Sequence, residues 1–137
     1  MQTFLPYPDM EKSLKVLDSR RLGKQRVEAF QILNIILGRT EKKGWKNHPA
    51  VKMWKQYPDA LKFYFNSAVR EWISRGYINN MKPEIIKGKI AMPHWFGLKE
   101  FHSSHRSNLL RKNKKYYSKF KWKENPSMSY FWPSEDY

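Results

Sequence analysis

Hydrophobic and polar positions repeat with a helical period in two long segments, residues 19–37 and 58–74. Within each segment the apolar side chains are three or four residues apart, which places them on one face of a helix. The apolar positions are Leu22, Ala29, Leu33 and Ile36 in the first segment, and Leu61, Phe65, Ala68 and Trp72 in the second. Gly38 follows the first segment and Gly76 the second, as expected where helices stop. The pattern predicts two long amphipathic helices.

Capping residues and prolines predict shorter helices around these two. Asp9 is suited to cap a short first helix, and Asp18 to cap the helix that follows. Pro49 favours the first turn of a third helix, and Pro58 is expected to kink or restart it. Either Ser103 or Ser104, which are adjacent serines, is expected to cap a last helix that runs through Arg111.

The remaining segments carry no steady period. Residues 1–8 contain two prolines and should run extended, and residues 39–46 should form a loop. Residues 77–95 should form a long ordered connection that is a candidate to line a site, and residues 125–137 an irregular tail. With no internal repeat and no hairpin signature, the fold class is all-α. We expect one compact helical bundle in a single domain, with an extended N-terminal segment and an irregular aromatic C-terminal tail.

The charge of the chain indicates its partner. The 137 residues include 27 Lys and Arg against 12 Asp and Glu, for a formal net charge of +15. Such an imbalance favours a polyanion, either nucleic acid or an acidic membrane surface. Because the sequence shows no transmembrane segment and no secretory signal, we expect double-stranded DNA and no membrane partner. The absence of cysteine gives no reason to place the chain outside a reducing interior, so we expect a cytoplasmic, nucleoid-associated monomer, or a location in an infected host cell if the source is viral.

Aromatic side chains alternate with lysines near the C-terminus, between Lys114 and Trp132. Rings that stack on bases beside cations that bind phosphates would form a nucleic-acid surface. Equally, the rings could pack the tail onto the helices while the lysines reach water. Both interpretations remain open for each ring.

One carboxylate lies among cations on the polar face of segment 19–37. Arg21, Lys24, Gln25, Glu28 and Gln31 are spaced to share that face, opposite the apolar residues. Spacing alone is equally consistent with an exposed ion pair between Lys24 and Glu28, worth about 0.3 kcal/mol.

Short motifs spread along most of the chain carry a resemblance to a known family. They are residues 17–28 (LDSRRLGKQRVE), Asn47-His48-Pro49, residues 71–77 (EWISRGY), Pro93-His94 and Tyr116-Tyr117. In their order, and in the total length of the chain, they resemble the pyrimidine dimer DNA glycosylase family. The resemblance implies an all-α fold in which the amino terminus passes between helices to reach the DNA.

The resemblance also implies the chemistry and two catalytic residues. The α-amine of the first residue attacks C1′ of the damaged nucleotide, displaces the base and leaves a Schiff base that eliminates the 3′ phosphate. The family's catalytic glutamate matches Glu28. An α-amine has a pKa near 8, about two units below that of a lysine, so it is more often unprotonated at neutral pH. No metal and no cofactor is implied.

Two features of this sequence depart from the family pattern. The family nucleophile is usually a small residue uncovered by removal of methionine, whereas residue 2 is Gln, whose bulk disfavours that removal. We therefore expect the amine of Met1 to act. Val27 and Gln31 stand where the family has basic residues, and Arg21 and Arg26 are candidates to supply those phosphate contacts.

The expected DNA-binding residues are Gln2, Arg20, Arg21, Lys24, Gln25, Arg26, His48, Arg106, Arg111, Tyr116 and Tyr117. His48 matches a family histidine near the active site, but it is equally suited to cap the helix that starts at Pro49. Arg106 matches a phosphate-binding arginine, or else lies on a solvated helix face. His102 and His105 are three apart as metal ligands often are, yet the cationic surroundings oppose a dication.

Three functions fit these observations. The first is a DNA glycosylase with AP lyase activity on damaged pyrimidines, chiefly pyrimidine dimers. The second is a basic DNA-binding protein on the same scaffold without catalysis. The third is a glycosylase of the same mechanism directed at a modified base.

Overall fold

The computed structural model describes residues 1–41 and 44–133, and these residues form helices and irregular segments without a strand. The helices are α1 (Met10–Lys15), α2 (Ser19–Ile36), α3 (Pro49–Lys52), α4 (Pro58–Ser74), α5 (Lys99–Lys112) and α6 (Lys114–Tyr117), followed by a 3₁₀ turn at Ser118–Phe120. The predicted all-α class is confirmed.

The expected start signals are confirmed for the first four helices. The carboxylates of Asp9 and Asp18 accept backbone N–H groups of α1 and α2, and Pro49 and Pro58 stand in the first turns of α3 and α4. Gly38 and Gly76, which follow α2 and α4, both have positive φ, a conformation that glycine adopts without strain.

The prediction that Ser103 or Ser104 caps the last long helix is wrong. Helix α5 begins at Lys99, so both serines lie inside it. The buried face of α5 is largely polar and includes His102, Ser104 and His105. Because the apolar period is missing there, no hydrophobic pattern marks the first turn of this helix.

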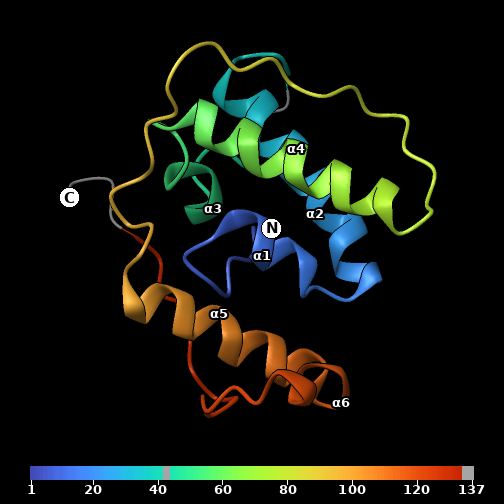
Figure 1. The fold of residues 1–137 in the computed structure, drawn as a ribbon. Coiled ribbons are helices and arrows are strands. Elements are labelled where there is room, and N and C mark those ends of the chain that lie inside the picture. The colour runs from blue at the N-terminus through green and yellow to red at the C-terminus, as the bar shows by residue number, and fades with distance from the viewer. Residues whose placement is uncertain (42–43, 134–137) are drawn as a thin grey trace.

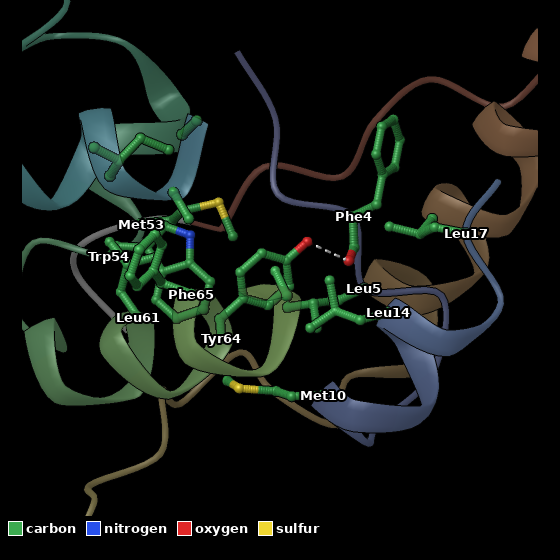
Figure 2. Packing of buried hydrophobic residues seen from close by; sticks show 14 of the residues in the cluster. Phe4, Leu5, Met10, Leu14, Leu17, Met53, Trp54, Leu61, Tyr64 and Phe65 are labelled. Carbon is green, nitrogen blue, oxygen red and sulfur yellow. Dashed lines mark hydrogen bonds between the residues drawn. The ribbon is translucent and has the colours of Figure 1, made fainter. Parts of the chain in front are cut away.

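The N-terminal segment runs through the middle of the molecule. Figure 1 shows it, in blue, between α2 and α4 on one side and α5 on the other. Helix α2 packs mainly against α4, and Gly23 allows the close approach because a Cβ there would lie 3.0 Å from the Trp72 ring. Phe4 and Leu5 belong to the core, and Leu5 lies near Tyr64 of α4 (Figure 2).

The connection between α4 and α5 follows a different course, over the outside of α4 (Figure 1). The irregular C-terminal segment lies against α5, where Ser107 Oγ donates to the carbonyl of Asn125. Its aromatic rings pack against the core, and the Tyr117 and Trp122 rings stack at 5.6 Å. This supports the packing interpretation for those rings. Residues 134–137 of the predicted tail lie outside the described residues.

Within the described residues, no helix is both long enough and apolar enough to cross a membrane.

Candidate active site

The first residues of the chain meet Glu28 in a pocket of about 460 Å³. The backbone N–H of Gln2 donates to Glu28 Oε2 at 3.1 Å, so the start of the chain is held beside the carboxylate. We call this hollow the Glu28 pocket. Its lining consists of Met1, Gln2, Phe4, Arg20, Arg21, Lys24, Gln25, Glu28, Lys112 and Tyr130.

Helix α2 supplies half of the described lining of this pocket, and all but Arg20 of that half comes from the face that the sequence predicted. Arg21, Lys24, Gln25 and Glu28 lie on it together, as expected, but Gln31 is on another part of the helix surface. Glu28 is not paired with Lys24; its Oε2 accepts the Gln2 N–H and the Gln25 side-chain amide at 3.3 Å. The simple exposed ion pair is therefore excluded.

Gln25 is buried, although its spacing placed it on the polar face. Its Oε1 accepts the backbone N–H of Phe4 at 2.7 Å and the hydroxyl of Tyr64 at 2.7 Å. The same amide that steadies Glu28 therefore also fixes the incoming N-terminal segment.

Every residue from Thr3 to Pro6 is held by a side chain of another element. Trp54 Nε1 donates to Thr3 Oγ1 at 2.9 Å, and the Tyr64 hydroxyl donates to the carbonyl of Phe4 at 2.9 Å (Figure 2). On the α5 side, His105 Nδ1 accepts the Leu5 N–H, His102 Nδ1 contacts the Leu5 carbonyl, and Arg106 donates to the Pro6 carbonyl. This set of bonds fixes the position of the chain start relative to Glu28.

The two histidines of α5 have complementary roles. His102 Nε2 accepts the Gly97 N–H at 2.9 Å, so its proton is on Nδ1, which donates to Leu5. His105 Nδ1 accepts, so its proton is on Nε2. Burial lowers the pKa of both histidines. At His105 the charge of His102 adds to the effect of burial, and together they lower the pKa to about 3.

In the described part of the chain, no three His, Cys, Asp or Glu side chains are grouped so that they could hold a metal ion.

His48 has one of the two roles that its sequence context allowed, the cap of α3. Its Nδ1 accepts the Ala50 N–H at 3.0 Å, which caps α3. Burial lowers the pKa of His48, the positive amino terminus lowers it further, and the charge of Glu28 raises it. His48 is not among the described lining residues of the Glu28 pocket.

Other expected DNA-binding residues lie away from the Glu28 pocket. Arg26 stacks over the Trp72 ring and donates to Asn79 at 2.6 Å. Arg106 bonds Pro6, Ser103 and Glu124, and Arg111 bonds Asn108 and the carbonyls of Pro126 and Met128. Residues 77–95 contribute nothing to the described lining of the pocket.

The two tyrosines of α6 differ in exposure. Tyr117 is fully buried and donates its hydroxyl to Asp18, so its expected role in stacking on DNA is corrected to a structural one. Tyr116 is partly buried, with Lys119 Nζ 3.9 Å from its ring centroid.

Sequence reasoning missed Lys112 and Tyr130, which complete the pocket from α5 and the C-terminal segment. Both are more than 80 residues from Glu28 along the chain, and no local pattern signals that approach. The result is a pocket with one carboxylate, the chain start and four cationic side chains, a composition suited to a phosphate backbone.

A family model described as pyrimidine dimer DNA glycosylase matches residues 1–84. The match includes the N-terminal segment, Glu28 and α1–α4, and it spans more than half of the chain. The chain belongs to the pyrimidine dimer DNA glycosylase family. No curated protein and no solved structure gives a significant match. The family therefore accounts for the part of the chain that brings Gln2 to Glu28, while α5 lies beyond the matched range.

Proposed function

We propose that this protein is a DNA glycosylase with AP lyase activity that acts on pyrimidine dimers in double-stranded DNA. The observation that carries the proposal is the hydrogen bond from the Gln2 N–H to Glu28 Oε2, 3.1 Å long, inside a cationic pocket. Gln2 directly follows Met1, whose amine is the proposed nucleophile, so this bond supports a role for that amine beside Glu28. Family membership supports the same substrate.

The proposed reaction uses these two groups in sequence. The amine nitrogen, having lost a proton, bonds to C1′ while the bond from C1′ to the base breaks; the base keeps that electron pair and takes up a proton. Opening of the sugar ring gives a Schiff base between the amine and C1′. Loss of a C2′ proton then expels the 3′ phosphate. Glu28 would stabilise the positive charge that develops on the sugar and then accept the C2′ proton.

The surrounding side chains divide into two groups. Arg20, Arg21, Lys24 and Lys112 are proposed to bind phosphates on either side of the damaged nucleotide. Gln25 bonds to both Glu28 and Phe4, so it would hold the carboxylate at a fixed position relative to the chain start.

Trapping with borohydride tests the proposal, because reduction converts a Schiff base into a stable link between protein and DNA. The untagged protein should give a trapped species on abasic and on UV-irradiated duplex. Acetylation of the amino terminus, or an added Gly-Ser before Met1, should abolish it. Glu28→Gln should bind but not cut, whereas the matched control Glu100→Gln, at an exposed position of α5, should behave as wild type.

The alternative is a DNA-binding protein without catalysis on this scaffold. It would bind duplex with an affinity that falls steeply with salt, yet leave abasic DNA intact and give no trapped species. That combination would overturn the proposed activity.

A further inference from the structure

Tyr130 enters the Glu28 pocket from the irregular C-terminal segment, beyond residues 1–84 of the family match. It lines the pocket together with Glu28 and the cationic side chains of Arg21 and Lys112. Its hydroxyl makes no hydrogen bond within the described part of the chain, and it does not belong to the polar atoms buried there without a partner. The hydroxyl is therefore available to a ligand.

Buried side chains of α5 hold the backbone on both sides of Tyr130. Ser107 Oγ accepts the N–H of Met128 at 3.0 Å, and Ser104 Oγ accepts the N–H of Phe131 at 3.1 Å. Both serines are at most 1% exposed, so these bonds are shielded from water. The segment that carries Tyr130 is thus fixed to α5 at two points, one before the tyrosine and one after it.

The ring of Tyr130 packs against residues that also hold the chain start. Its centroid is 5.8 Å from that of His105, in an edge-to-face arrangement, and 6.3 Å from that of Phe4. His105 also accepts the N–H of Leu5, so one buried side chain positions both the N-terminal segment and the Tyr130 ring. The fold itself therefore sets where this ring stands relative to Glu28.

The surroundings of the hydroxyl suit a neutral phenol that donates to an anion. Burial raises the pKa of Tyr130, the charges of Arg111 and Arg21 lower it, and the charge of Glu28 raises it. The net direction is upward, so the hydroxyl keeps its proton at neutral pH. A phosphate oxygen is the acceptor that the cationic pocket attracts, and tyrosine hydroxyls commonly donate to phosphates in complexes with DNA.

We propose that the Tyr130 hydroxyl donates a hydrogen bond to one of the two phosphates that flank the damaged nucleotide. This inference rests on the proposed function and adds to its site a residue from beyond the family match. Arg21 and Lys112 attract the phosphates by charge, whereas a hydroxyl on a packed ring adds a donor at a fixed position. The bond would hold the sugar beside Glu28 and the Met1 amine, where the proposed reaction takes place.

Tyr130→Phe tests the hydroxyl alone, because it keeps the ring and its packing. Binding is measured on a duplex that carries a tetrahydrofuran residue, an analogue of the abasic site that has no C1′ leaving group. The dissociation constant should rise about tenfold. The urea midpoint should stay at the wild-type value, because the hydroxyl has no partner in the described protein. The matched control Tyr77→Phe, at an exposed ring stacked on Trp72, should bind as wild type.

Two outcomes of this first measurement would overturn the proposal. One is an unchanged dissociation constant for Tyr130→Phe. The other is weaker binding together with a lower urea midpoint, which would show that the hydroxyl serves the fold and not the DNA.

Two further duplexes locate the acceptor. Each carries a methylphosphonate, which has no charge and one oxygen fewer, at the phosphate on the 5′ or the 3′ side of the tetrahydrofuran. The defect of Tyr130→Phe should shrink to less than about twofold on at least one of them. A defect that stays about tenfold on both would overturn the proposal. Borohydride trapping on a true abasic duplex tests the proposed function separately. If wild type gives no trapped species, that function fails, while the dissociation constants still decide the role of Tyr130.

Discussion

The N-terminal segment and the connection between α4 and α5 share a sequence signature but not a structural role. Both contain two prolines and lack a helical period. Yet Thr3 and Leu5 are fully buried, whereas Ile78 and Ile85 of the connection are 85% and 74% exposed. The first segment is held by side chains from both sides, while the second lies over the surface of α4. Side chains of other parts of the chain therefore satisfy the backbone of the buried irregular segment, and that is the segment which carries the proposed nucleophile.

The largest expected difference between the two segments is in stability, and it concerns two side-chain amides, each of which hydrogen-bonds to the backbone of one segment. Gln25 accepts the N–H of Phe4, and Asn66 bonds both the N–H and the carbonyl of Glu84 in the connection. Gln25→Leu leaves a buried donor unsatisfied and should lower the free energy of unfolding by about 2 to 3 kcal/mol. Asn66→Leu should cost less than about 1 kcal/mol, since water can replace its bonds. Urea denaturation measures both, and equal losses would contradict the comparison.

The burial of Gln25 also shows which features of the site can be predicted from the sequence and which cannot. The spacing on α2 predicted that Gln25 and Glu28 share a face, and the capping residues predicted where the helix starts, because both are local properties. The sequence does not show that this face meets the chain start, because that depends on packing between distant segments.

The roles of the polar residues of helix α5, by contrast with the shared face of α2, could not be predicted from local patterns. Its polar residues serve the backbone of Leu5 and Pro6, about 100 positions earlier in the chain. Without a partner in view, His102 and His105 resemble metal ligands and Arg106 resembles a phosphate contact. The polar side chains of α5 could have indicated that this helix binds some polar group. They do not indicate which segment of the chain supplies that group.

The buried histidine should make the anchoring of the N-terminal segment sensitive to acid. With the pKa of His105 at about 3, the folded protein binds fewer protons than the unfolded chain between about pH 6.5 and 3. Stability is therefore fully present above about pH 6.5 and falls by about 1.4 kcal/mol per pH unit below it. His105→Asn keeps an acceptor for Leu5 but cannot titrate, so its unfolding free energy should lack this part of the slope. Parallel curves for wild type and variant from pH 7 to 4 would refute the assignment.

Two arginines allow a finer comparison. Arg106, 18% exposed, bonds Pro6 and pairs with Glu124, whereas Arg39, 41% exposed, pairs with Glu84 of the connection. Burial raises the pKa of Glu124, but the hydrogen bond and charge of Arg106 lower it more. Arg106→Gln should cost about 1 to 2 kcal/mol and Arg39→Gln about 0.5 kcal/mol or less.

The same Arg106→Gln variant distinguishes a structural arginine from a phosphate contact. If its three internal partners account for its role, the variant should leave the salt dependence of DNA binding unchanged. By contrast, Lys24→Gln, in the Glu28 pocket, should lower the log–log slope by about 0.9. A comparable drop in slope for Arg106→Gln would show that this arginine binds phosphate after all.

The smallest effect is expected from lengthening the connection. Gly88 is exposed and has a φ of 77°, and the space around it is open, so a Gly-Ser insertion after it meets no packed neighbour. The cost of closing a slightly longer loop is well under about 0.6 kcal/mol, so the unfolding free energy and the yield of trapped adduct should stay at their wild-type values. A loss of trapping without a loss of stability would mean that the connection contributes to the reaction. The contrast between a buried anchored segment and an exposed connection would then fail as an account of where the chemistry lies.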